Sequence, residues 1–322
     1  MVSPVLVHSV VLSSIIALLG VGLTLTYMTT RVPNFAHGGT ATVGMYVGLT
    51  AVKLWHGNPY VYSPVSFLLG GFTGLGLYFL VLKPLIRREA SFVSLMIATI
   101  GFDFCVFSVI SIYADYLLRV YQITSSFFIL SDADFRFGGL GGGEFDSALP
   151  GILLVAPLLV ILLTVFLHQL LTRTRFGVSM RATVENPSLA GVVGVNVNLV
   201  YSVSWFVSGG LAGLAGLLSV LVISGSPQTG NELLPSIFAA SITGGLGNIY
   251  GTILGAFIVG MSSVLGTSYL ASTISAQAFA YRPIIPVIFM VISLLLAPKG
   301  LAALDWASAV RYVRAKLLGH TC

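Results

Sequence analysis

Apolar residues fill most of this chain, in runs long enough to cross a membrane. A membrane-spanning helix needs roughly 20 mostly apolar residues. The candidate runs cover 5–28, 36–55, 62–82, 91–114, 148–170, 197–225 and 282–298. The pattern predicts an all-α bundle of transmembrane helices.

Two breaks interrupt the apolar pattern. GGLGNIYG at 244–251 divides the apolar stretch 236–266, which is too long for one straight span and too short for two, so we predict two short helices meeting at the glycines. VPNFAHGG at 32–39 is expected to break the entry to the second span, because Pro33 disfavours helix before it. We therefore predict a polytopic bundle with broken or re-entrant helices and about eight to nine membrane-crossing segments.

Composition supports a membrane protein. Of 322 residues, 56% are hydrophobic and 8% are charged, whereas soluble domains carry about 25% charged residues. The cysteines, Cys105 and Cys322, offer neither a disulfide framework nor a zinc cluster.

The distribution of charge predicts the orientation in the membrane. One face would carry most of the 15 basic residues, namely Arg31, Lys83, Arg87, Arg88, Arg173, Arg175, Arg181, Lys299, Arg311, Arg314 and Lys316. Because basic loops favour the cytoplasm, we predict a multi-pass protein of the cell membrane with its N-terminus outside and its C-terminus inside.

The same reasoning divides the chain into a transmembrane domain and a tail. The transmembrane domain covers 1–298, with an outside loop at 115–147 and a cytoplasmic loop at 171–198. A short surface helix is expected near 120–130 in the outside loop. The basic tail, 299–322, is expected to lie on the lipid of the inner leaflet as an amphipathic helix.

Several kinds of chemistry are missing from the sequence. It contains no GxxxxGK[ST] phosphate loop, no HExxH motif and no GxSxG elbow. It also has no dense basic patch for nucleic acid. We therefore predict a protein that is not an enzyme and has no catalytic residues, metal site or cofactor.

Polar residues at membrane depth are candidates for lining a pathway. They are Asn34, His37, Asp103 and Asn248. Asn34 and His37 could equally cap the exposed backbone of the break. Asp103 could instead make a hydrogen-bonded contact between helices, or lie nearer the interface.

The segment RTRFGVSMRATVENPSLAGVVGVNVN, 173–198, predicts two short helices on the cytoplasmic face. Asn186 followed by Pro187 is a strong helix start, and Gly194 can end that helix. Glu185 is expected to shape the junction by capping or by pairing with Arg181. Leu189, Ala190, Val192 and Val193 would be exposed, which favours a docking site for another protein over a loop packed on its own spans.

RATVENPSLAGVVGVNV at 181–197 resembles the cytoplasmic coupling segment of permeases from ABC importers of branched-chain amino acids. NFAHG (34–38), KPLIRREASFVSLMIATIG (83–101), SITGGLGNIYGTILGAFIVG (241–260) and RPIIPVIFMVISLLLAPKGL (282–301) resemble other parts of that family, in the same order. The resemblance covers most of the chain, and NFAHG is similar to the shorter of the two paralogous permeases. Val184 departs from the family, which usually has a small residue before the ENP triplet.

The resemblance implies a permease subunit whose ATPase sites lie on other chains. Its partners would be ATP-binding cassette subunits, a second permease (a paralogue or a second copy) and an extracytoplasmic solute-binding protein. The loop 181–196 would couple to the ATPases, through Arg181, Glu185, Asn186, Pro187, Leu189, Ala190 and Gly194. The alternatives are a permease of the same family for urea or short amides, and a stand-alone secondary carrier or channel.

Overall fold

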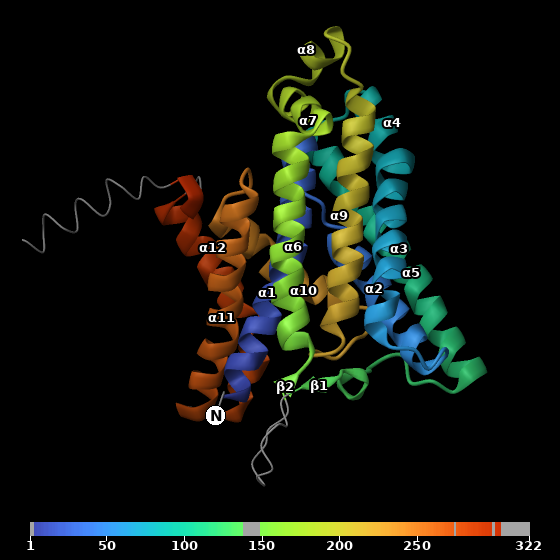
Figure 1. Cartoon of the computed structure of the whole chain (residues 1–322), viewed down its shortest axis with the longest axis vertical. Coiled ribbons are helices and arrows are strands. Elements are labelled where there is room, and N and C mark those ends of the chain that lie inside the picture. The colour runs from blue at the N-terminus through green and yellow to red at the C-terminus, as the bar shows by residue number, and fades with distance from the viewer. Residues whose placement is uncertain (1–2, 138–148, 274, 298–299, 304–322) are drawn as a thin grey trace, which may run out of the picture.

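We describe the protein from a computed structural model that places residues 3–137, 149–273, 275–297 and 300–303 (Figure 1). The α-helices are α1 Pro4–Thr30, α2 His37–Lys53, α3 Ser63–Gly76, α4 Lys83–Arg87, α5 Phe92–Tyr121, α6 Ile152–Arg173, α7 Arg175–Glu185, α8 Pro187–Val192, α9 Val197–Ser219, α10 Thr229–Gly244, α11 Ile249–Thr273 and α12 Ile284–Leu296. The 3-10 helices are η1 Pro59–Tyr62, η3 Ser131–Ala133, η4 Ala276–Tyr281 and η5 Leu301–Ala303, and η2, Leu77–Leu82, is a π-helix. Strand β1, Arg136–Phe137, pairs antiparallel with β2, Leu149–Pro150. The all-α prediction is confirmed apart from this short ribbon.

Six helical segments of the described chain are long and apolar enough to cross a membrane. They are Pro4–Thr30, Pro59–Arg87, Phe92–Tyr121, Ile152–Arg173, Val197–Ser219 and Ile249–Thr273. Helices α2, α10 and α12 are shorter, so helix length does not confirm eight or nine crossings. Two helices also end at other residues than the sequence predicted. Helix α5 continues past 114 to Tyr121, and α9 ends at Ser219 rather than at 225.

The helix ends gather at two opposite ends of the molecule (Figure 1). Helices α4, α7 and α8 lie together at one end, and the N-terminus and the β1–β2 ribbon lie at the other. The surface helix expected near 120–130 is not present, because Phe128 and Leu130 instead donate backbone hydrogen bonds to the loop after α9, at Gly225 and Val220. Residues 138–148 of the outside loop and 304–322 of the tail lie outside the described residues.

Helix α9 is the centre of the bundle because its glycines let two neighbours approach closely. A β-carbon at Gly213 would overlap the carbonyl of Ser66 in α3, and one at Gly44 of α2 would overlap the carbonyl of Gly213. The Ser66 hydroxyl donates to that same Gly213 carbonyl over 2.7 Å. Small residues are the usual means of close helix packing in membranes, and here they join α2, α3 and α9 into one unit.

Both predicted breaks are present. After α1 the chain turns at Arg31, which has a positive φ of 55°, and α2 starts only at His37. The His37 Nε2 atom lies 2.9 Å from the carbonyl oxygen of Leu19, about halfway along α1, so α2 begins inside the bundle. The second break separates α10 from α11, but α11 has 25 residues and is not the short helix that we predicted.

Candidate functional site

The predicted pair of short helices forms at one end of the bundle, as α7 and α8 (Figure 1). The Asn186 side chain accepts a hydrogen bond from the Leu189 amide over 3.0 Å, which is the predicted N-cap. Gly194 follows with a φ of 89°, the left-handed conformation that ends a helix. The two caps fix both the start and the end of α8.

The apolar face of α8 is directed away from the protein. Leu189, Val192 and Val193 are 61%, 84% and 70% exposed, and positions three and four apart share one face of a helix. Ala190 is only 2% exposed, so our expectation that it belongs to the exposed surface is wrong. It lies on the opposite face of the helix, against the protein.

The expected Arg181–Glu185 pairing is also replaced by another contact. The Arg181 guanidinium donates to the carbonyl of Leu171, near the end of α6. Carbonyls in the last turn of a helix lack partners within the helix, which explains why this cation turns toward α6. Arg181 thus ties α7 to α6 and fixes the base of the loop.

Asn248 lies near this loop and apart from the other polar candidates. Its side-chain oxygen accepts hydrogen bonds from the amides of Tyr250 and Gly251, over 2.9 and 3.1 Å, and so caps α11. It shares with Arg31, Arg181 and Glu185 the wall of a cavity of about 460 Å³ at the α7 end. Its geometry is that of a helix cap.

The other three polar candidates gather where the chain breaks before α2. Asn34 accepts a hydrogen bond from the Ala36 amide over 3.1 Å, and the Phe35 amide donates to Thr99 of α5 over 3.3 Å. One turn further along α5, Asp103 lies against Gly39 of α2. A β-carbon at Gly39 would overlap the Oδ1 atom of Asp103. Helix α5 therefore contacts the start of α2 through two successive turns.

The start of α10 meets the start of α2 at the same place. A β-carbon at Gly38 would overlap the carbonyl of Gly230, and one at Gly230 would overlap the carbonyl of Gly38. Asn231 donates from Nδ2 to Asp103 Oδ2 over 2.8 Å. We call this meeting point the α2–α10 crossing and define it by Gly38, Gly39, Asp103, Gly230 and Asn231.

Asn231 was not among the residues expected from the sequence. The apolar run in the sequence begins at 236, whereas α10 begins at Thr229. The signal that was available is the turn-forming sequence SPQTGN at 226–231, directly before a run of helix formers.

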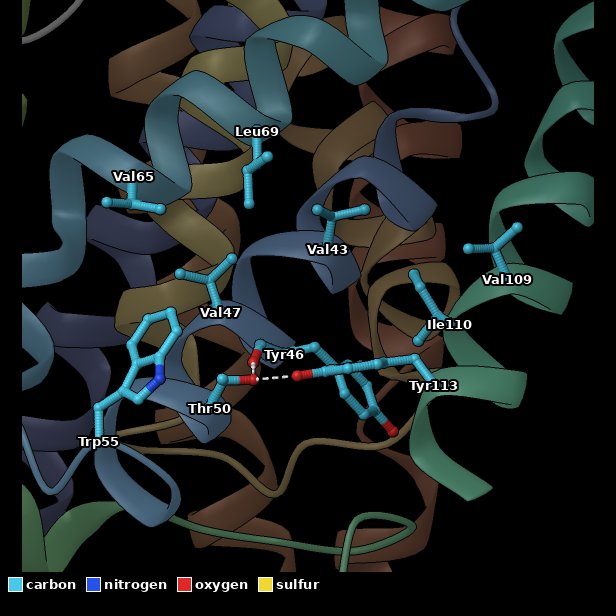
Figure 2. A pocket seen from close by; sticks show the side chains of 10 residues that line it. All are labelled: Val43, Tyr46, Val47, Thr50, Trp55, Val65, Leu69, Val109, Ile110 and Tyr113. Atoms are coloured by element: carbon cyan, nitrogen blue, oxygen red, sulfur yellow. Dashed lines mark hydrogen bonds between the residues drawn. The ribbon is translucent and has the colours of Figure 1, made fainter. Parts of the chain in front are cut away.

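A groove lies between α2, α3 and α5 (Figure 2). Its volume is about 310 Å³, within the range of small-molecule sites. The Thr50 and Tyr113 hydroxyls, 2.8 Å apart, join α2 to α5 across its floor. The lining residues are Val43, Tyr46, Val47, Thr50, Trp55, Val65, Leu69, Val109, Ile110 and Tyr113.

Comparison with known proteins gives a consistent picture. Residues 5–296 match the profile of the family described as "Branched-chain amino acid transport system / permease component". The chain is 43% identical, over 95% of its length and 94% of the relative's, to the protein named probable branched-chain amino acid transport permease protein LivH of Methanocaldococcus jannaschii. It is 24% identical, over 91% and 93%, to the high-affinity branched-chain amino acid transport system permease protein LivH of Salmonella typhimurium.

The chain was also compared with solved structures. PsaBC from Streptococcus pneumoniae in complex with Fab aligns with 92% of this chain and 94% of its own, at a TM-score of 0.49 and 11% identity.

Proposed function

This chain belongs to the branched-chain amino acid transport permease family, and we propose that it is a membrane subunit through which an ATP-driven importer passes branched-chain or related aliphatic amino acids. The substrate class follows the names of relatives that align over nearly the whole chain. The chain has no phosphate loop of its own, so partner ATP-binding cassette subunits would hydrolyse the nucleotide. A second permease and an extracytoplasmic binding protein would complete the importer.

The observation that carries this proposal is the exposed apolar face of α8. Leu189, Val192 and Val193 project from a helix that is fixed by the Asn186 cap and by the Arg181 contact with α6. A rigid apolar knob fits a hydrophobic groove on a partner protein. Because α7 follows α6 and α8 leads into α9, movement of the docked helix would reach two long helices directly.

The orientation that suits this function places α7 and α8 in the cytoplasm. Arg31, Lys83, Arg87, Arg88, Arg173, Arg175 and Arg181 belong to the end of the bundle that carries these helices. Short basic loops favour the cytoplasmic side. The groove of Figure 2 includes Thr50 and Trp55 at the C-terminal end of α2, and we propose that it faces the binding protein.

Co-purification tests the docking proposal. Leu189→Asp places a charge in the apolar face of α8, and the tagged chain should lose most of its ATPase subunits while it remains monodisperse. Val61→Asp is the matched control, because Val61 is 71% exposed and lies in η1, beside the opposite end of α2. Retention of the ATPases by Leu189→Asp would disprove the assignment of α8.

Uptake tests the substrate class. The assembled importer is reconstituted in liposomes, with ATP enclosed in the lumen, for the molecules whose α8 faces the lumen. When binding protein is added outside, these liposomes should accumulate radiolabelled leucine, isoleucine and valine. Uptake of urea or acetamide with no uptake of these amino acids would reject the proposed substrate.

A further inference from the structure

A second cavity, near the start of α1, is lined by one acidic and one basic side chain. Its volume is about 400 Å³, within the range of small-molecule sites. It lies between α1, α10, α11, the start of α12 and the loop that follows α9. Because α1 starts at the end of the bundle opposite α8, the cavity lies toward that end (Figure 1). We call it the α1–α12 pocket and define it by His8, Leu12, Ile16, Glu232 and Arg282, which all line it.

Arg282 is the cation of the pocket, and it reaches across to α1. Its Nη2 atom lies 3.3 Å from the Nε2 atom of His8. A guanidinium only donates hydrogen bonds, so the imidazole accepts through Nε2 and is neutral. The guanidinium has five N–H donors in a planar fork, and this contact uses one of them. Arg282 therefore keeps its charge and further donors for another acceptor.

Glu232 is the anion of the pocket. It lies in the first turn of α10, and its side chain is exposed. The positive end of a helix favours a carboxylate at this position, but that does not neutralise it. Within the described residues, no ion pair joins Glu232 to Arg282 or to another cation, although both residues line one cavity. The pocket thus presents two opposite charges that are not paired with each other.

The deeper wall of the pocket is apolar. His8, Leu12 and Ile16 follow one another at four-residue spacing and share one face of α1. Leu12 and Ile16 are only 4% and 1% exposed, whereas Glu232 is exposed and Arg282 is half-buried. A ligand entering from the surface would meet the charges first and the aliphatic wall beyond them. This arrangement suits a molecule with two opposite charges at one end and a hydrocarbon group at the other.

We propose that the α1–α12 pocket binds an aliphatic α-amino acid in its zwitterionic form. Arg282 binds the carboxylate, a pairing that its planar fork favours. Glu232 binds the ammonium group, and the aliphatic side chain lies against Leu12 and Ile16. This inference rests on the proposed function and adds where the permease recognises its solute and through which groups. Urea or a simple amide carries neither charge, so it would leave both charged residues without a partner.

The inference predicts which compounds protect the pocket from chemical labelling. In the assembled importer, Cys105 and Cys322 are replaced by serine, and Ser236→Cys or Ile223→Cys supplies a reporter on one of two different walls. Each reporter is labelled with N-ethylmaleimide in the absence of ATP and binding protein. Leucine should slow labelling several-fold at millimolar concentration. The analogue 4-methylpentanoate lacks the ammonium group and 3-methylbutylamine lacks the carboxylate, so each should need roughly tenfold more compound, the loss expected for one charged hydrogen bond.

Substitution of each charged residue should remove only one of the two preferences. In Glu232→Gln, leucine and 4-methylpentanoate should protect about equally, while 3-methylbutylamine protects less. In Arg282→Gln, leucine and 3-methylbutylamine should protect about equally, while 4-methylpentanoate protects less. A purely structural role of either residue predicts instead that all three compounds weaken together. Asp115→Asn changes an acid to its amide at an exposed position of α5 and should keep the order of the parent.

Each result has a definite meaning. Three results would overturn this inference and leave the proposed function intact: an analogue that matches leucine in the parent, charge variants that keep the order of the parent, or no protection of either reporter in an importer that takes up leucine. The last result is also expected if Glu232 and Arg282 simply pair across the pocket. An importer that takes up no branched-chain amino acid would reject the proposed function itself. The comparison of compounds uses the native Glu232 and Arg282, so it decides the matter even where a charge variant does not fold.

Discussion

At the scale of single residues, the close packing of the helices depends on glycines, which have no side chain. Gly213 faces Ser66 and Gly70 of α3 on one side and Gly44 of α2 on the other, with backbone atoms as the nearest neighbours. Backbone cannot move aside as the end of a flexible side chain can. A methyl group at this position must therefore separate helices that are packed closely along their length.

Gly213→Ala should accordingly destabilise the protein. Overpacking of a close contact costs about 1–3 kcal/mol, so we expect a lower midpoint of thermal unfolding in detergent, followed by loss of the monodisperse fraction. Gly101→Ala is the control, because no atom lies within 4 Å of a β-carbon at Gly101. Equal midpoints for the two variants would contradict the packing role of Gly213.

Single residues also show how far the sequence could predict the site. Asn34, His37 and Asp103 were identified as polar groups in apolar surroundings, and the structure brings them to the break before α2. Asn231 is 128 residues from Asp103 in the sequence, and nothing local indicates that they touch. The sequence can show that a polar group lies in an apolar run. It cannot show which residue that group contacts, because the contact depends on how distant helices cross.

At the scale of elements, α8 is a helix of six residues that cannot be stable alone. Isolated helices this short lack enough hydrogen bonds to offset nucleation. Its stability must therefore come from the Asn186 cap, the Gly194 turn and the burial of Ala190. The cap and the turn are local features, which explains why the sequence predicted where α8 starts and ends, whereas the burial of Ala190 depends on packing against the rest of the protein.

Removal of the cap should loosen α8 without altering its apolar face. Asn186→Ala costs about 1 kcal/mol at an N-cap, and we expect faster amide exchange in 187–193 together with weaker retention of the ATPases. Asn186→Ser retains a capping oxygen and should restore both properties. Asn196→Ala removes the equivalent cap from α9 and should leave exchange in α8 unchanged. Unaltered exchange in Asn186→Ala would show that the cap does not hold the helix.

The start of α2 was predictable from the sequence, but the end of α9 was not. Pro33 and the pair Gly38–Gly39 predict the break before α2. In contrast, the apolar sequence LLSVLVIS at 217–224 predicts that the span continues. The structure ends α9 at Ser219, where Leu130 donates to the Val220 carbonyl and the chain turns back toward the crossing. An apolar composition gives no sign of this end, because the cause is a hydrogen bond from another part of the chain.

At the scale of the whole molecule, burial separates inner from outer helices. Buried positions make up 78% of the most apolar part of α9 and 72% of that of α1, but 28% for α5 and 22% for α6. All four are strongly apolar, so hydropathy alone did not distinguish them. Helices α5 and α6 direct apolar side chains outward, which requires lipid or a second permease around them.

The orientation that we propose for this bundle rests on its charges and can be measured directly. In a background without Cys105 and Cys322, a membrane-impermeant maleimide should label Val61→Cys in intact cells and Ser188→Cys only in inside-out vesicles. Both positions are exposed, Val61 in η1 and Ser188 in α8, so the difference reports the side of the membrane and not burial. The physical reason is that arginines and Lys83 outnumber the acids at the α8 end, and positive loops are retained in the cytoplasm. Labelling of Ser188→Cys from outside intact cells would show that the orientation is the reverse of the one proposed. In that orientation α8 could not couple to a cytoplasmic ATPase.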